Sequence, residues 1–334
     1  MQTSLPKILI IGSGLLGLGL NNLFRVNGFT TRITVRNQTT DKNLLIKAEK
    51  TNLKNKLIQH GGVICDTLDD YKRVISEYNP THIIDTIPQP TQELVSYLLS
   101  IDNCFKFEFS SPASDFAKAF PDKCPIGSYP GDKFTLEKLV NQRGIEKQDA
   151  LVTQIGFIPE IVTLDGKPVL SGLSLETMIM CNLLTGQYDS EISSDLHIAL
   201  AKFDKSKGFT CTTINNIYRF LHDIITGLVV PQNIFGRTLA MHSSQVWPRS
   251  EICNALTNSN YKNSLPEFYG QKSQDKISNP VTTYINALCN NPVYCVSHQD
   301  VVSAIQDSSK LFKDPTFRQQ LIETAIAYAY SQGK

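Results

Sequence analysis

Short apolar runs alternate with segments of helical periodicity through the first half of the chain. The apolar runs predict strands at Lys7–Ile11, Arg32–Val35, Val63–Cys65, His82–Asp85, Phe105–Phe109 and Leu151–Ile155. Helical spacing of apolar residues predicts helices at Leu15–Val26, Lys42–Gln59, Leu68–Tyr78, Gln92–Ile101 and Lys133–Gln142. Strands that alternate with helices over short connections pair in parallel through right-handed crossovers. The pattern therefore predicts an α/β, Rossmann-type doubly wound parallel sheet.

The pattern becomes less regular after Phe157. Polar, loop-like stretches separate apolar helices that we expect at Ile214–Thr226 and Phe317–Tyr330. Asp300 precedes another apolar helix, where we expect it to cap the helix or to make a hydrogen bond between lobes. We expect a first domain over residues 1–156 and a smaller, less regular lobe over residues 157–334, partly woven back into the first.

Composition excludes several classes of function. The formal net charge of the 334-residue chain is +1, which gives no electrostatic reason to expect nucleic acid or an anionic membrane as a partner. No run approaches the roughly 20 apolar residues that a membrane helix needs, and the N-terminus has no signal peptide pattern. The eight cysteines show no metal-binding spacing. We expect a cytoplasmic protein with reduced thiols.

The first predicted strand runs directly into the sequence GSGLLG, which has the spacing GxGxxG and opens a helix. In this context the glycines permit a tight turn and close approach of the backbone to a pyrophosphate, and the helix N-terminus attracts its negative charge. We expect the backbone at five positions to bind a dinucleotide: Gly12, Gly14, Leu15, Leu16 and Gly17. The first domain would then bind the nucleotide, and the second lobe a small-molecule substrate.

The second strand ends in Arg36 and Asn37, and it lacks the terminal carboxylate that binds the ribose hydroxyls of NAD. A guanidinium group pairs well with a phosphate and stacks on adenine. We therefore expect NADP as the cofactor, with NAD as the alternative, and assign Arg36 and Asn37 to its binding site. A solvated strand end is the competing interpretation of Arg36.

Several segments together resemble the short-chain dehydrogenase/reductase superfamily, in its extended or atypical branches. GGVICDTLDD resembles the third strand and the acidic turn after it, HIIDTIPQP the fourth strand, FKFEFSSPASDF the fifth strand with its Ser-Ser end, and SYPGDKFTLEKLV the Tyr-xxx-Lys helix. The resemblance implies that Asp66 contacts adenine and that Pro88 lies beside the substrate. It also implies that Tyr129 donates or accepts the proton and that Lys133 modulates the pKa of Tyr129 and binds the ribose. Ser111 would donate a hydrogen bond that orients the substrate. Homodimers are common in this superfamily.

The residues support the same assignment without the resemblance. A phenol with an ordinary pKa of about 10 is a weak base at neutral pH, and a neighbouring ammonium group favours its ionised form. Residues four apart share one helix face, so Tyr129 and Lys133 would lie side by side. Ser111 follows a central strand, with Ser110 and Ser114 as further candidates. Because Pro130 follows Tyr129, we expect Tyr129 to cap the helix rather than to lie within it.

We therefore expect an NADP(H)-dependent oxidoreductase or epimerase that acts on a small carbonyl or hydroxyl compound, and the resemblance favours a nucleotide-linked sugar. Arg249 would bind an anionic part of the substrate, unless it belongs to a surface loop. Two alternatives stay open. One is a catalytically silent NADP-binding regulatory or scaffold protein. The other is a Rossmann-plus-helical-domain dehydrogenase of the ketopantoate reductase type, for which the loop-rich segment from Gly156 to Ser278 is a poor match.

Overall fold

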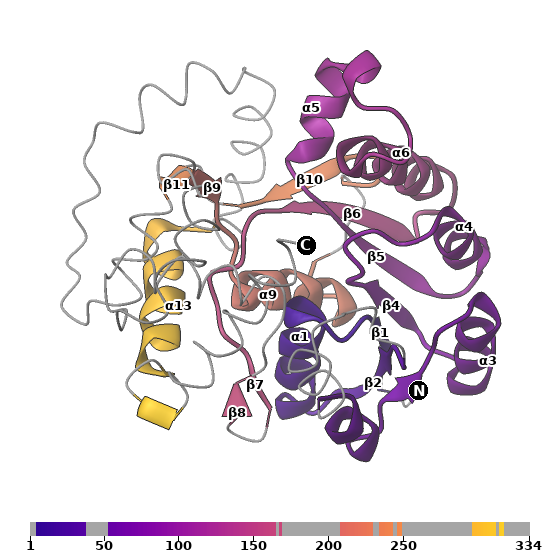
Figure 1. Ribbon diagram of the computed structural model, residues 1–334. Helices are drawn as coiled ribbons and strands as arrows, with labels where there is room; N and C mark the ends of the chain where they lie inside the picture. Colours follow the sequence, from indigo (N-terminus) through magenta and orange to yellow (C-terminus); the bar gives the residue numbers. More distant parts are fainter. Residues whose placement is uncertain are drawn as a thin grey trace, which may run out of the picture.

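The computed structural model describes residues 5–37, 53–164, 167–168, 208–229, 234–242, 246–248, 296–311 and 314–316. Its centre is a seven-stranded sheet with the strand order β10-β6-β5-β4-β1-β2-β3 (Figure 1). The strands are β1 (Lys7–Ile11), β2 (Thr30–Val35), β3 (Val63–Ile64), β4 (His82–Asp85), β5 (Phe105–Ser110), β6 (Ala150–Ile155) and β10 (Thr238–Met241). All six pairings are parallel, which confirms the predicted fold class.

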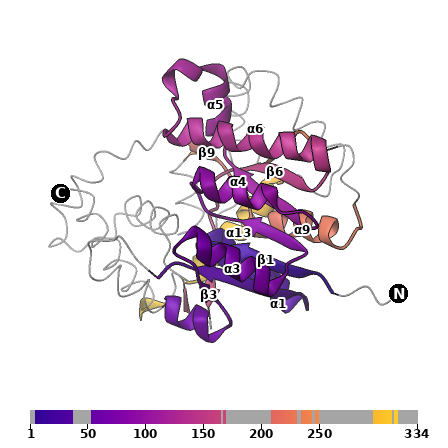
Figure 2. The ribbon, with the colours of Figure 1, turned by 90° about the vertical axis from the view of Figure 1, so that its right-hand side faces the viewer.

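Helices cover both faces of the sheet. Helix α1 (Leu15–Val26) and helix α9 (Ile214–Ile225) lie on one face. Helices α3 (Leu68–Tyr78), α4 (Gln92–Ser100) and α6 (Tyr129–Lys147) lie side by side across the other (Figure 2). Alternate residues of β1 serve the two sides: Ile8 and Ile10 join the core under α1 and α9, whereas Leu9 and Ile11 join the core under α3 and α4. A central strand buried on both faces explains the continuous apolar run that predicted β1.

Most described helices begin at a hydroxyl side chain that accepts a hydrogen bond from a backbone N–H of the first turn. Thr67, Thr91, Ser128 and Thr213 do so at α3, α4, α6 and α9. Such caps satisfy donors that have no partner within the helix. Helix α1 differs, because its N-cap is Gly14 and no side chain caps it.

Four elements near the fifth and sixth strands differ from the prediction. A short helix, α5 (Ala113–Ala119), and the 3₁₀ turn η1 (Pro121–Lys123) lie between β5 and α6. Helix α6 begins four residues earlier than predicted, at Tyr129, and it ends at Lys147. Strand β10, from the irregular second half, adds to the edge of the sheet beside β6.

The remaining described elements belong to the second half of the chain. They are β7 (Thr163–Leu164), β8 (Lys167–Pro168), β9 (Gly208–Thr210), β11 (Val246–Pro248) and α13 (His298–Leu311). Asp300 accepts hydrogen bonds from the backbone and side chain of Ser297 at the start of α13, and Asn216 of α9 lies 3.5 Å from it. Asp300 is therefore not the cap itself: it lies in the first turn of α13, where its N–H donates to the Ser297 hydroxyl and its carboxylate binds back to Ser297. The predicted helix Phe317–Tyr330 and most of Lys42–Gln59 lie outside the described residues.

Among the described helices, none is long and apolar enough to cross a membrane.

Candidate functional site

The turn between β1 and α1 is closed by glycines and by Thr86, which directly follows β4. Gly12 has a φ of +100°, a conformation that favours glycine. Thr86 donates its hydroxyl to the carbonyl of Ile11, at 2.9 Å, and it also lies 3.3 Å from the carbonyl of Gly12. A Cβ at Gly17 would lie 2.0 Å from the Gly12 carbonyl oxygen. The helix therefore packs against the turn at a distance that only glycine permits.

The mouth of this turn is open. A Cβ at Gly14 would meet no atom within 4 Å. Because Gly14 is an N-cap without a capping side chain, the backbone N–H groups of Leu15, Leu16 and Gly17 begin the helix without a side-chain acceptor. No acidic residue occupies the first turn of α1. Free N–H groups, the positive end of a helix dipole and open space beside a glycine fit a pyrophosphate.

Strand β2 ends beside the acidic turn that follows β3. The backbone N–H of Asn37 donates to the carboxylate of Asp66 at 2.7 Å, and Lys54 donates to the Asn37 side chain at 2.8 Å. Arg36 is exposed and lies near the hydroxyl of Tyr71 in α3. Burial raises the pKa of Tyr71, and the positive charge of Arg36 opposes that rise. These contacts bring the three residues predicted to bind adenosine together at one sheet edge.

The three predicted serines occupy the end of β5 and the start of α5. Ser111 is half-buried directly after β5, and its carbonyl accepts hydrogen bonds from the backbone and hydroxyl of Ser114. Ser110 and Ser114 are fully buried beneath α6. Of the three, Ser111 alone keeps some exposure, so it is the best placed to meet a substrate.

Tyr129 and Lys133 lie together on the first two turns of α6. The N-cap is Ser128 and Pro130 follows in the first turn, so the expectation that Tyr129 caps the helix was wrong. Proline tolerates this position because it needs no hydrogen bond there. Tyr129 is 41 % exposed, whereas Lys133 is buried. The Lys133 Nζ lies 5.9 Å from the centre of the Tyr129 ring and donates to the carbonyl of Phe109 at 2.7 Å.

The sequence did not predict the carboxyl groups that lie beneath Lys133. Asp85, at the end of β4, and Glu108, in β5, are register partners on adjacent strands, and both are buried. Glu137 lies one turn beyond Lys133 on α6 and accepts hydrogen bonds from Ser114 and Gln154. A signal was present: FKFEFS alternates apolar and polar residues in a strand predicted to be central, where both faces are normally apolar.

The other predicted site residues are less informative. Pro88 is exposed in the turn after β4, close in sequence to Thr86 of the glycine turn. Arg249 lies outside the described residues. Among the residues that the structure describes, no group of three or more histidine, cysteine or acidic side chains is arranged to hold a metal ion.

No protein-family model matches the sequence, and no curated protein matches it. Solved structures do share its fold. The Bordetella bronchiseptica enzyme WbmH in complex with NAD⁺ has a TM-score of 0.54 at 10% identity, over 93% of this chain and 99% of that one. UDP-glucuronic acid 4-epimerase from Bacillus cereus, in complex with UDP-glucuronic acid and NAD, has a TM-score of 0.53 at 14% identity, over 91% and 99%.

A reductase has a similar fold. A thiolation-reductase di-domain from an archaeal non-ribosomal peptide synthetase has a TM-score of 0.50 at 13% identity, over 94% of this chain and 92% of that one. At these identities the likeness is one of fold. It extends well beyond the first domain, since each alignment covers more than nine tenths of the present chain.

Proposed function

We propose that this chain, which has the fold of the extended short-chain dehydrogenases/reductases, is a nicotinamide-dependent oxidoreductase or epimerase of a small carbonyl or hydroxyl compound. One observation carries the proposal: a tyrosine and a buried lysine lie side by side at the start of α6, in a sheet whose β1–α1 turn is open for a pyrophosphate. Ligands of open α/β sheets bind at the carboxyl ends of the strands. Both features lie at that edge.

The side chains fit acid–base catalysis at a carbon that bears oxygen. When bound, the cofactor supplies hydride transfer at the nicotinamide ring. Tyr129 would give a proton to the substrate oxygen during reduction, or remove it during oxidation, while the Ser111 hydroxyl orients that oxygen. The Lys133 ammonium, 5.9 Å from the centre of the Tyr129 ring, would stabilise the negative charge that develops on the phenol oxygen as the proton moves. The carbonyl of Phe109 fixes the lysine in place behind the tyrosine.

For the cofactor we favour NADP over NAD. Arg36 and Asn37 end β2 in place of the usual acidic residue, and Asp66 holds the backbone of Asn37. The solved relatives contain NAD, so the preference rests on Arg36. A nucleotide-linked sugar is the favoured substrate class, because a nucleotide sugar is bound in the Bacillus cereus structure.

Replacement of Tyr129 by phenylalanine tests the catalytic role. We expect turnover to fall by about 10²–10⁴-fold, the usual contribution of a general acid or base, with NADPH affinity nearly unchanged. Turnover is measured as NADPH oxidation with keto-sugar nucleotides and simple ketones. Tyr97→Phe, on α4, is the matched control. Equal activity in Tyr129→Phe rejects the role, and a wild-type protein that binds NADPH without any turnover supports the silent scaffold instead.

Replacement of Arg36 by alanine tests the cofactor preference. A charge-assisted hydrogen bond contributes about 1.5–3 kcal/mol, so NADPH affinity is expected to fall roughly 10- to 100-fold while NADH affinity changes little. Isothermal titration with both dinucleotides measures the difference, and Arg25→Ala on the exposed end of α1 is the control. An unchanged ratio of the two affinities would mean that Arg36 is a solvated strand end.

A further inference from the structure

Strand β5 buries polar side chains on the face that α6 covers. Its phenylalanines Phe107 and Phe109 join the core under α1 and α9, so Lys106, Glu108 and Ser110 point to the opposite face. Glu108 is 2 % exposed, and Asp85, its register partner on β4, is 1 % exposed. Two carboxyl groups on neighbouring strands are thus enclosed together.

Lys133 reaches the same buried region from α6. It is 4 % exposed, and its Nζ donates a hydrogen bond to the carbonyl of Phe109, the residue after Glu108. Burial lowers the pKa of Lys133, and the negative charges of Glu108, Asp85 and Glu137, in that order, oppose the fall. The lysine that faces Tyr129 on one side therefore faces acidic groups on the other.

Near neutral pH the two strand carboxyls do not both ionise at this buried position, because burial and the charge of each group disfavour ionisation of the other. Burial raises the pKa of Glu108 well above its usual value, and the charge of Asp85 adds to the rise. Burial raises the pKa of Asp85 to about 7, against a hydrogen bond from the Ile87 N–H and the charges of Lys133 and Arg36. One oxygen of each carboxyl, Asp85 Oδ2 and Glu108 Oε1, has no hydrogen-bond partner among the described residues. A pair that carries one proton has one negative charge, which matches the single charge of Lys133.

The third acid is engaged elsewhere. Glu137 accepts hydrogen bonds from Ser114, Gln154 and, at 3.3 Å, the Thr238 hydroxyl of β10. Asp115 of α5 adds a negative charge near Glu137. On the side of β2 and α3, Arg36 and Tyr71 face Asp85. The groups that face Lys133 with unpartnered oxygens are therefore Asp85 and Glu108.

We propose that Asp85 and Glu108 are positioning residues for Lys133: together they carry one proton and one negative charge, which keeps the lysine ammonium charged and aimed at Tyr129. This inference rests on the proposed function and extends it from the Tyr-xxx-Lys helix to the sheet below. The charge of the Asp85–Glu108 pair also depends on pH. When it loses its remaining proton, its second negative charge holds the Lys133 ammonium more tightly.

The pH dependence of turnover is the first test. Burial lowers the pKa of Lys133, and the charges of Asp85 and Glu108 oppose that fall. Without these charges the ammonium loses its proton at lower pH. In Glu108→Gln and in the double variant Asp85→Asn with Glu108→Gln, we expect the alkaline limb of kcat/KM to move down by about one pH unit or more, the size of a single close charge effect. Asp102→Asn, an exposed carboxylate at the amino end of β5, is the control. A limb that stays in place in both variants overturns the proposal.

The second test observes Lys133 directly and needs no turnover. Nuclear magnetic resonance of protein with labelled lysine side chains follows each lysine through its titration, and Lys133→Met identifies the resonance. The Lys133 titration midpoint is expected to fall in both carboxyl variants and to stay unchanged in Asp102→Asn. Thermal unfolding confirms that each variant is folded. An unshifted Lys133 midpoint contradicts the inference, whereas an inactive wild type that binds NADPH contradicts the proposed function alone.

Discussion

Two glycines of the same turn have different roles at the scale of the single residue. At Gly17 a methyl group would collide with the Gly12 carbonyl, at 2.0 Å, and with the Thr86 hydroxyl, at 2.6 Å. At Gly14 it would project into open space. Gly17 is therefore required by packing within the protein. Gly14 leaves space that a ligand can occupy.

Alanine at each position therefore separates folding from cofactor binding. Gly17→Ala is expected to destabilise the protein by about 1–3 kcal/mol, the usual cost of overpacking. Gly14→Ala is expected to keep nearly the wild-type stability but to bind NADPH at least roughly tenfold more weakly, because its methyl group occupies the space beside the helix N-terminus. Thermal unfolding and dinucleotide titration measure the two effects. Wild-type affinity in Gly14→Ala would place the pyrophosphate elsewhere.

The residue scale also shows where sequence reasoning succeeded and where it failed. His82 begins a strand that was predicted correctly, and it packs beside the rings of Phe105 and Phe107, where burial lowers its pKa to about 4. Tyr129 was misplaced by one position at the helix start. The rule for residues before proline pointed to Tyr129 as the cap, but the hydroxyl of Ser128 offers a better acceptor for the first-turn N–H groups.

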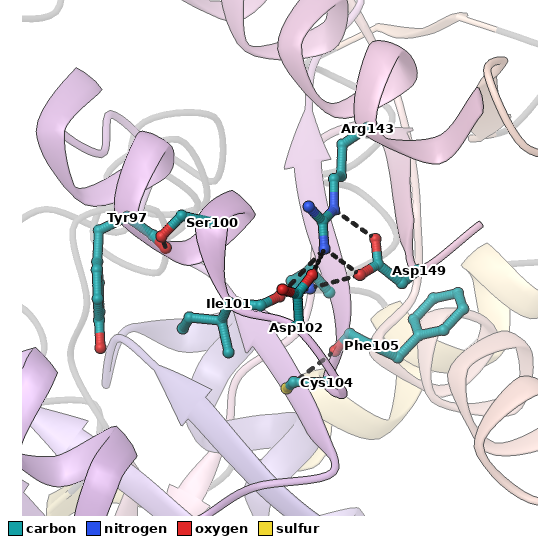
Figure 3. A network of polar contacts seen from close by, with 9 residues as sticks. Tyr97, Ser100, Ile101, Asp102, Cys104, Phe105, Arg143 and Asp149 are labelled. Atoms are coloured by element: carbon teal, nitrogen blue, oxygen red, sulfur yellow. Dashed lines mark hydrogen bonds and ion pairs between the residues drawn. The ribbon is translucent and has the colours of Figure 1, made fainter. Parts of the chain in front are cut away.

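At the scale of elements, an ionic cluster fastens the amino end of β5 to its neighbours, at the opposite end from the candidate site (Figure 3). Asp149, just before β6, accepts two hydrogen bonds from Arg143 of α6, at 2.6 and 2.8 Å, and one from the buried Lys106, at 2.8 Å. Arg143 also contacts Asp102, and Lys106 donates to the carbonyl of Ile101. Burial disfavours ionisation of Asp149, but the hydrogen bonds from Arg143 and Lys106 outweigh it and lower its pKa.

Removal of the shared carboxylate leaves the buried Lys106 ammonium without its ion-pair partner and leaves Arg143 with Asp102 alone. Asp149→Ala is expected to reduce the free energy of unfolding by about 3–5 kcal/mol, the usual cost of breaking a buried ion pair. Because Asp149 binds its proton more weakly when folded, its contribution is present above its unfolded pKa of about 3.9 and disappears as pH falls through the lower folded value. Urea unfolding at neutral and acidic pH measures both effects. Asp69→Asn, in an exposed pair with Lys72, is the control and should change stability little.

Element boundaries were well predicted where one periodicity and one cap agreed. Helices α1 and α3 and strands β1 and β4 have the predicted bounds. Helix α5 was missed because its seven residues are too short to show a helical apolar pattern. The buried acids of β4 and β5 were missed for a different reason. Each is polar in sequence, and only the pairing of Asp85 with Glu108 and the position of Lys133 above them make a cluster.

At the scale of the whole molecule, the order of the sheet brings the candidate site together. The glycine turn follows β1, Arg36 follows β2, Asp66 follows β3, and Ser111 follows β5. Since all these strands are parallel, their carboxyl ends lie along one edge. The alternation of strands and helices in the sequence was sufficient to predict this convergence. It could not predict β10, which comes from the irregular half of the chain and whose place beside β6 depends on contacts distant in sequence.

The place of β10 has a consequence for dissecting the protein. A fragment that stops at residue 156 would expose the whole hydrogen-bonding edge of β6, a strand of buried residues, and would remove the Thr238 hydroxyl that binds Glu137. The unpaired backbone N–H and C=O groups of an exposed apolar edge strand form hydrogen bonds with other chains, which leads to aggregation. The fragment is therefore expected to aggregate. A longer fragment that extends through residue 242 would include β10, the missing edge strand.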